Sequence, residues 1–422
     1  MLSIRDLTAS PGQKVTGNVL IGMTSNSTSS TSDSSTNQVV PITILNGIED
    51  GPTVLVLSGI HGSEYIPIFA SQRLGNELDP SALKGSLILV HIANLAAFLG
   101  RTVYTNPIDG KNLNRVFPGN SNGTLTEQIA HFLVQEVYPL ANYVLDMHSG
   151  DANEQLGPSY TAYYGKAGSP ELIAASKAMA IAFGLDLVVE FQWELVGNNS
   201  NAIWAGSAAV VRGIPSIDVE MAPGMGRTTS DSIDEAYTGV LRVMDHLDMF
   251  ETKPVTGVMD EGTTQEPCLI KERYFVEAPL DGSWTPLVDA GTFVAQGTSM
   301  GYVTDFHGRA TNFEPIAPSE GLLIIRYESP PVVKGDTVAV IAVLNTSDSA
   351  CSRMKNGALM DGVNEADNNI ILWQWTAAIG WLVALVSVMW RPRRHLSHQP
   401  HVHRVMPLSS TVDEFGTEIE MI

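Results

Sequence analysis

The segment TVLVLSGIHGSE (residues 53–64) joins a run of apolar residues to a short turn with a histidine and a glutamate. The apolar residues 53–58 predict a buried strand. Gly59 and Gly62 predict a tight turn directly after it, because glycine accepts backbone angles that other residues avoid. Open α/β sheets bind ligands beyond the carboxyl ends of their strands. We therefore expect His61 and Glu64 at a functional edge of a sheet.

The residues on both sides of this segment also form a regular pattern. Short apolar strands alternate with helical patterns over residues 39–252, which predicts an α/β domain with a mostly parallel or mixed sheet flanked by helices. The expected strands cover 53–58, 86–92, 143–147 and 215–219, and the expected helices cover 66–78, 126–137, 170–183 and 234–249. Residues 1–38 precede this domain, with a strand at 17–22 and a Ser/Thr/Asn-rich, low-complexity loop at 25–37.

The pattern changes after residue 250. Residues 265–343 read as short strands separated by Gly, Pro and Asp turns, in two similar halves. This predicts a small, partly symmetric all-β barrel. Residues 344–422 form a polar tail that contains one apolar segment at 370–390.

The apolar segment 370–390 is long enough for a transmembrane helix. A helix of its length would span ~30 Å. Arg391, Arg393 and Arg394 follow it, which predicts that the long N-terminal part lies outside the cytosol. The first residues lack the pattern of a signal peptide, in conflict with that orientation. An interfacial helix and a tail absent from the physiological product are the alternatives, so the location stays open between membrane-associated and cytoplasmic.

Composition narrows the function classes. Of 422 residues, 44% are hydrophobic and 16% are charged, which is typical of a folded protein with a sizeable core. The net charge of -21 argues against a nucleic-acid partner, because no basic stripe is present to neutralise phosphates. Two cysteines do not make a disulfide framework. We expect Cys268 to be a buried core residue and Cys351 to be a free thiol in the tail.

A second histidine follows a second predicted strand. His148 comes directly after YVLDM (143–147). Catalytic zinc takes three protein ligands and keeps a fourth position for water, and His61, Glu64 and His148 could supply the three. The alternative for His148 is a core histidine at a strand end. Asp146 is a candidate partner that orients the imidazole of His148, with a solvent-facing charge as its alternative.

Two further segments carry candidate site residues. The turn-rich loop 106–119 holds Asn114 and Arg115, whose amide and guanidinium donors suit a substrate carboxylate. The alternative is that Arg115 pairs with Asp109. Glu220 follows the predicted strand 215–219, where a carboxylate could take a proton from a metal-activated water. Glu190 and Glu194 are weaker candidates for this role.

Together these motifs resemble the succinylglutamate desuccinylase/aspartoacylase family of zinc deacylases, in the zinc-carboxypeptidase superfamily. The resemblance runs from about residue 39 to 343. It rests on GIHGSEY (59–65), DGKNLNRVFPG (109–119), LDMHSG (145–150), VEMAPG (219–224) and the terminal β-domain. It implies one zinc held by His61, Glu64 and His148, Glu220 as general base and acid, and a substrate carboxylate bound by Asn114 and Arg115.

The resemblance favours the broad predicted-deacylase branch over aspartoacylase itself. Tyr65 stands where aspartoacylases carry an arginine after the ligand glutamate, which argues against N-acetylaspartate. Some members of the branch act on acetylated diamino acids, so such a compound is one candidate. We predict hydrolysis of a small N-acylated amino acid or amine. A zinc carboxypeptidase and a non-catalytic, membrane-tethered binding module are the alternatives, and the oligomeric state stays open.

Overall fold

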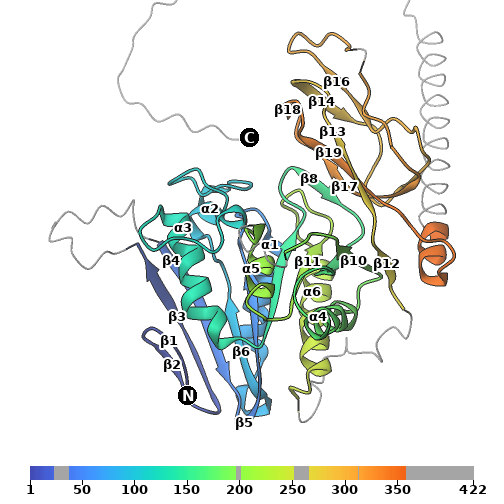
Figure 1. Ribbon diagram of the computed structural model, residues 1–422. Coiled ribbons are helices and arrows are strands. Elements are labelled where there is room, and N and C mark those ends of the chain that lie inside the picture. The colour runs from blue at the N-terminus through green and yellow to red at the C-terminus, as the bar shows by residue number, and fades with distance from the viewer. Residues whose placement is uncertain (23–37, 196–200, 251–265, 312, 358–422) are drawn as a thin grey trace, which may run out of the picture. The chain divides into compact units, whose positions relative to one another are not determined.

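A computed structural model describes residues 1–22, 38–195, 201–250, 266–311 and 313–357. Its largest element is a nine-stranded sheet (Figure 1). In the order in which they lie across the sheet, the strands are β12 (Cys268–Ile270), β10 (Leu187–Phe191), β9 (Tyr160–Tyr164), β11 (Ser216–Met221), β7 (Tyr143–Ser149), β5 (Glu49–Ser58), β6 (Lys84–Val90), β4 (Gln38–Asn46) and β3 (Gln13–Ile21).

The sheet is mixed. Strands β6, β5, β7 and β11 run parallel to one another. Strand β9 is antiparallel to β11, and β4 is antiparallel to both β6 and β3. Strands β5, β7 and β11 therefore end at the same edge, which becomes the floor of the candidate site. A short hairpin of β1 (Leu2–Ile4) and β2 (Leu7–Ala9) precedes the sheet.

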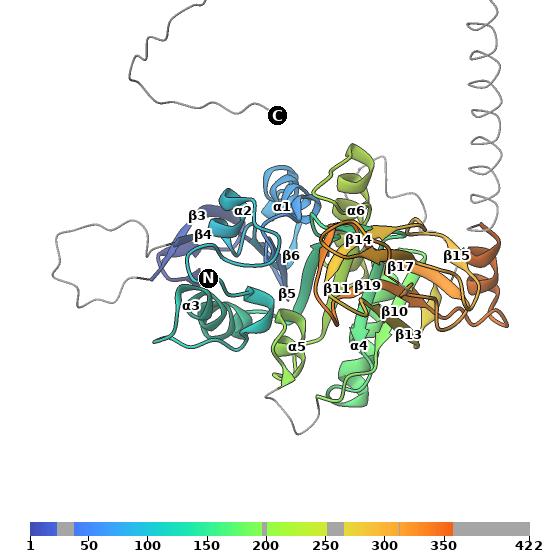
Figure 2. The same ribbon diagram turned by 90° about the horizontal axis from the view of Figure 1, so that it is seen from above.

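Helices cover both faces of the sheet (Figure 2). Alternate residues of β5 point to opposite faces: Val54 and Val56 join one core, and Leu55 and Leu57 join the other. The first core contains α1 (Tyr65–Glu77), α4 (Pro170–Phe183) and α6 (Ser230–His246). The second contains α3 (Leu125–Phe132) and α5 (Ala205–Val210), while α2 (Leu95–Gly100) follows β6. The predicted mixed sheet flanked by helices is confirmed.

Residues after β12 form a separate β-domain with its own apolar core around Trp284, Val303 and Ile341. The segment predicted as a small barrel contains two small sheets. One has β13 (Arg273–Glu277), β19 (Thr337–Ala342), β17 (Gly321–Tyr327) and β15 (Phe293–Val294); the other has β16 (Gly301–Thr304), β14 (Gly282–Pro286) and β18 (Pro331–Val332). Strand β8 (Glu154–Leu156) of the α/β domain pairs with β17 and joins the two domains.

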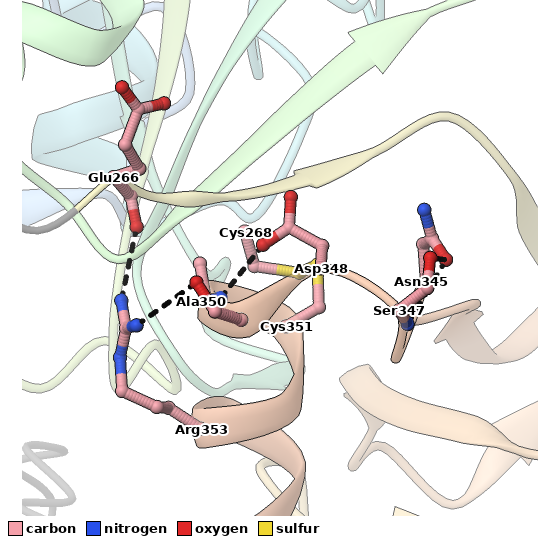
Figure 3. Close-up of a disulfide and its surroundings, with 9 residues drawn as sticks. Glu266, Cys268, Asn345, Ser347, Asp348, Ala350, Cys351 and Arg353 are labelled. Carbon is pink, nitrogen blue, oxygen red and sulfur yellow. Dashed lines mark hydrogen bonds between the residues drawn. A yellow bond between two sulfur atoms is a disulfide. The ribbon is translucent and has the colours of Figure 1, made fainter.

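The expectation of two unpaired cysteines is wrong. Cys268 and Cys351 form a disulfide, with Cα atoms 4.6 Å apart at a sequence separation of 83 (Figure 3). Cys268 begins the edge strand β12, and Cys351 lies in a helical segment that starts at 349 and packs beside that strand. Both side chains are buried. Sequence spacing could not reveal the pair, because the fold of the whole β-domain brings the two cysteines together.

The described part of the chain contains no helix with the length and apolar character that a membrane crossing requires. The predicted segment 370–390 and the low-complexity loop 25–37 lie outside the described residues.

Candidate active site

The predicted metal ligands lie at the edge where β5, β7 and β11 end. His61 and Glu64 follow β5, with Glu64 immediately before α1, and His148 lies near the end of β7. The turn depends on glycine. Gly59 has φ +68°, and a Cβ on Gly62 would lie 2.3 Å from the carbonyl oxygen of Ala97. Only a residue without a side chain permits this close backbone approach.

Three buried side chains converge in what we call the metal corner, made of His61, Glu64 and His148. Glu64 uses both carboxylate oxygens: Oε1 lies 2.7 Å from His61 Nδ1, and Oε2 lies 2.9 Å from His148 Nδ1. One potential ligand atom from each residue lies within 4.8 Å of the others. Two imidazoles and one carboxylate are a donor set that catalytic zinc sites use.

The electrostatics of the metal corner favour a cation. Burial acts to raise the pKa of Glu64, but the charges and hydrogen bonds of His148 and His61 outweigh it and lower the pKa to about 2. Burial acts to lower the pKa of His148, and the carboxylates of Glu64 and Asp146 raise it well above its usual value. Positive charge is thus stabilised at this point, which fits a divalent metal ion.

Neighbouring side chains orient His148. Asp146 Oδ1 lies 3.2 Å from His148 Nε2, and Asp146 Oδ2 accepts a hydrogen bond from the Gly206 amide at 3.0 Å. Asn114 Nδ2 lies 3.4 Å from the same ring nitrogen, while its Oδ1 accepts from the Ala205 amide at 2.8 Å. Asp146 therefore contacts His148 and does not face solvent, contrary to the alternative considered for it.

Arg115 is not paired with Asp109. Asp109 accepts hydrogen bonds from the backbone and the hydroxyl of Thr126 and from the backbone of Lys111. Arg115 donates to the carbonyl of Asn114 at 2.7 Å, and its guanidinium lies 5.9 Å from the centre of the Trp204 ring. Among the described residues it has no carboxylate partner. Arg115 is thus available to an anion from outside.

Glu220 faces the metal corner from the neighbouring strand. It lies in β11 directly opposite His148 in β7, and it lines the same pocket. Burial raises its pKa well above the usual value. Within the described chain Glu220 has no hydrogen-bond or ion-pair partner. By contrast, Glu190 accepts from Tyr163 and Gln192, and the exposed Glu194 lies 3.8 Å from Lys166; neither lines this pocket.

The pocket has a volume of about 630 Å³ and includes residues that the sequence did not single out. Besides the predicted side chains, its lining includes Tyr104, Asp151, Glu154, Phe191, Trp193, Trp204, Arg273, Phe275, Ile325 and Tyr327. Tyr104 donates a hydrogen bond to Glu154 at 2.9 Å, and its ring packs edge-on against His61 at 5.7 Å between centres. Of these residues, Asp151 could most easily have been singled out from the sequence, because it is an acidic residue only three positions after His148.

Comparison with known proteins places this geometry in a family. Residues 50–247 match the model of the succinylglutamate desuccinylase/aspartoacylase catalytic domain. The chain is 30% identical over 306 residues to N-alpha-acetyl-L-2,4-diaminobutyric acid deacetylase from Halomonas elongata, covering 72% of this chain and 85% of that protein. The chain belongs to the succinylglutamate desuccinylase/aspartoacylase family. The predicted family is confirmed, and the chain is an enzyme that hydrolyses acyl–amide bonds.

Solved structures of this desuccinylase/aspartoacylase family share the fold over most of the chain. A succinylglutamate desuccinylase/aspartoacylase from Rhodobacter sphaeroides has a TM-score of 0.66 and 26% identity, covering 78% of this chain and 96% of that one. The product-bound ectoine utilization protein EutE (DoeB) from Ruegeria pomeroyi has a TM-score of 0.64 and 27% identity, covering 73% and 90%. The family fold therefore extends beyond the catalytic-domain match into the β-domain.

Proposed function

We propose that this desuccinylase/aspartoacylase family member hydrolyses the amide bond of a small N-acylated amino acid in a zinc-dependent reaction. One observation supports this above the others: the three donors of the metal corner and the unpaired Glu220 face one pocket. His61, Glu64 and His148 would hold the zinc ion. When bound, zinc supplies a water of lowered pKa and polarises the amide carbonyl.

Glu220 would carry the proton. Its carboxylate accepts a proton from the attacking water and then gives it to the departing nitrogen, so that one residue serves both halves of the reaction. A raised pKa suits this double role, because the protonated acid must form readily and release its proton again. Asp146 would keep Nδ1 of His148 turned toward Glu64 through its contact with the other ring nitrogen.

Arg115 and Asn114 would position the substrate. The free donors of Arg115 suit the α-carboxylate of an amino acid, which a planar guanidinium can bind with two hydrogen bonds. Asn114 is already fixed between Ala205 and His148, so it places this carboxylate close to the metal corner. Holding one end of the substrate would orient the amide for attack.

The β-domain favours a small substrate over a peptide. Phe275, Ile325 and Tyr327 belong to its strands, yet they line the pocket beside His61 and Glu220. A wall at this position leaves little room for a peptide chain that extends away from the site. We therefore expect turnover of N-acylated amino acids to exceed that of peptides with the same C-terminal residue.

The test compares two glutamates in strands of the same sheet, Glu220 in β11 and Glu190 in β10. Glu220→Gln should retain zinc and lose about 10²–10⁴-fold in turnover of N-acyl amino acids, as expected when a general base is removed. Glu190→Gln is the matched control and should keep its rate. Steady-state kinetics with elemental analysis provide both readouts. Full activity of Glu220→Gln, or faster cleavage of peptides than of N-acyl amino acids, would overturn the proposal.

A further inference from the structure

The two cysteines of the chain indicate the kind of compartment in which it folds. Cys268 and Cys351 are its only cysteines, and they are bonded to each other. Their relative exposures are 1% and 0%, so the bond belongs to the interior and is not an accessible redox-active pair. Disulfides of this kind form and persist in secreted proteins and in the endoplasmic reticulum or periplasm, and they are rare in the cytosol. The bond therefore indicates folding under oxidising conditions.

An exposed asparagine lies six residues before Cys351. Asn345 begins the sequence Asn345-Thr346-Ser347, which has the N-x-S/T pattern of an N-glycosylation acceptor. Residues 345–349 are all exposed, and they connect the segment after β19 to the helical segment that starts at 349. An oligosaccharide is bulky and requires such a surface position. The folded chain therefore has room for one at Asn345.

The side-chain amide of Asn345 is held through its oxygen alone. Oδ1 accepts hydrogen bonds from the backbone nitrogen of Ser347 at 3.3 Å and from its hydroxyl at 2.7 Å (Figure 3). Nδ2 makes no hydrogen bond to a described residue. The buried Asn46 differs, because its Nδ2 donates to the carbonyl of Ala9 at 2.9 Å. The nitrogen of Asn345 is thus oriented and unoccupied.

A second sequence with the N-x-S/T pattern is residues 122–124, directly before α3. Asn122 is exposed, and its backbone nitrogen donates to Asn120 Oδ1 at 3.0 Å. The Asn122 side chain makes no hydrogen bond to a described residue, so its Nδ2 is also free. The other two sequences of this pattern begin at Asn26 and Asn198 and lie outside the described residues.

Two features together support a modification. The N-x-S/T pattern alone arises by chance in a chain rich in asparagine, serine and threonine. Here, however, both described asparagines of the pattern are exposed with a free Nδ2. The buried disulfide independently indicates an oxidising compartment, which is the setting in which secreted proteins are glycosylated on asparagine.

We propose that Asn345 and Asn122 are N-glycosylation sites of this enzyme. The co-substrate is an oligosaccharide linked to a lipid diphosphate. A bond forms between Nδ2 and the anomeric carbon of the first sugar, while the bond from that carbon to the diphosphate breaks. The lipid diphosphate leaves with the electron pair, and one proton of Nδ2 passes to a base of the transferase. This modification does not depend on the hydrolysis proposed above.

Peptide mapping of the full-length protein purified from its native cells tests the inference. Treatment with a peptide N-glycosidase in heavy-oxygen water converts a glycosylated asparagine into an isotope-labelled aspartate. Asn345 and Asn122 should be labelled, whereas Asn120, which lacks the pattern, should not. Because an asparagine before glycine also hydrolyses spontaneously, a parallel sample without glycosidase gives the background at Asn122.

Two variants at one position separate the modification from a structural role of the turn. Ser347→Ala removes the acceptor pattern and leaves Asn345 in place, whereas Ser347→Thr preserves the pattern. In native cells, Ser347→Ala should lose the electrophoretic shift of one oligosaccharide, and Ser347→Thr should keep it. Both variants should retain the disulfide, because residue 347 is exposed.

The same peptide map, run without reductant, should find Cys268 and Cys351 in one linked pair of peptides. Unlabelled Asn345 and Asn122 in protein that contains this bond would overturn the inference. Free thiols at both cysteines after rapid alkylation of native cells would also overturn it, because they would indicate a reducing compartment. A label at one asparagine alone would support that site and exclude the other.

Discussion

The metal corner lies on one side of the pocket. An aromatic wall of Phe191, Trp193 and Trp204, which ends in Arg273, lies on another, and the two are built in opposite ways. The metal corner takes His61 and Glu64 from one turn and His148 from the adjacent strand. The wall takes Phe191 from β10, Trp193 from just after β10, Trp204 from the start of α5, and Arg273 from another domain. The metal ligands thus come from short sequence motifs, whereas the residues of the aromatic wall are brought together only by the tertiary fold.

The largest expected effect follows from removal of the Cys268–Cys351 disulfide. This bond holds β12, which leads to Arg273 at the end of the aromatic wall. Replacing Cys268 and Cys351 by serine should lower the free energy of unfolding by about 4 kcal/mol, because the bond closes a long loop. Cys268 lies five residues before Arg273, so KM should also rise while zinc content stays constant. Denaturant titration, kinetics and elemental analysis measure the three quantities.

Reductant provides the control for this experiment. Reduction should destabilise the wild-type protein and leave the double serine variant unchanged. Disulfides form and persist under oxidising conditions, so the wild type must be prepared in them. Loss of zinc from the double variant would contradict the separation of the two sides.

A smaller effect concerns the pH dependence of the stability of the α/β domain, which carries the metal corner. His91 is buried, with Thr43 Oγ1 and Ser71 Oγ each 2.8 Å from one of its ring nitrogens, and burial lowers its pKa to about 4. The unfolded chain binds a proton near pH 6.5, whereas the folded chain resists it. This contribution to stability is therefore present above pH 6.5 and is lost as the pH falls toward 4, up to about 3 kcal/mol.

His91→Gln removes this dependence. Unfolding of the metal-free protein between pH 7 and pH 4 should show a steeper loss of stability in wild type than in the variant. Metal-free protein is used so that zinc release does not contribute. Identical slopes would mean that His91 titrates normally in the folded state.

The smallest expected effect tests whether Asp146 orients His148 in the metal corner. Asp146→Asn removes the negative charge next to His148 Nε2 and keeps the size of the side chain. Zinc affinity should fall about 10–100-fold, as is usual when a partner of a ligating histidine is removed. Competition with a chelator measures it. Asp231→Asn, an exposed carboxylate in the first turn of α6, should have no effect; unchanged affinity in Asp146→Asn would exclude the orienting role.

The two sides also differ in what could be predicted from sequence. The strand-to-turn pattern located His61, Glu64 and His148, and the end of β11 located Glu220, because each signal is contained in a few consecutive residues. Helices such as 170–183 were predicted from local periodicity alone, and α4 has these bounds. The α/β fold followed from the alternation of such patterns.

Contacts between distant segments could not be predicted in this way. The position of Arg273 depends on β8 pairing with β17 and on β12 joining the edge of the large sheet. The Cys268–Cys351 pair depends on the same arrangement. Short elements such as β8 and α5 also lack a periodic pattern, since three to six residues do not complete one.

The most direct measurement of the central claim is the zinc content of the purified full-length wild type and of His148→Ala. Elemental analysis should find about one zinc per chain in the wild type and a loss of that zinc in the variant. The variant should also lose its hydrolysis of N-acyl amino acids. A folded wild-type protein that takes up no zinc, or a His148→Ala variant that keeps both its zinc and its activity, would contradict the account.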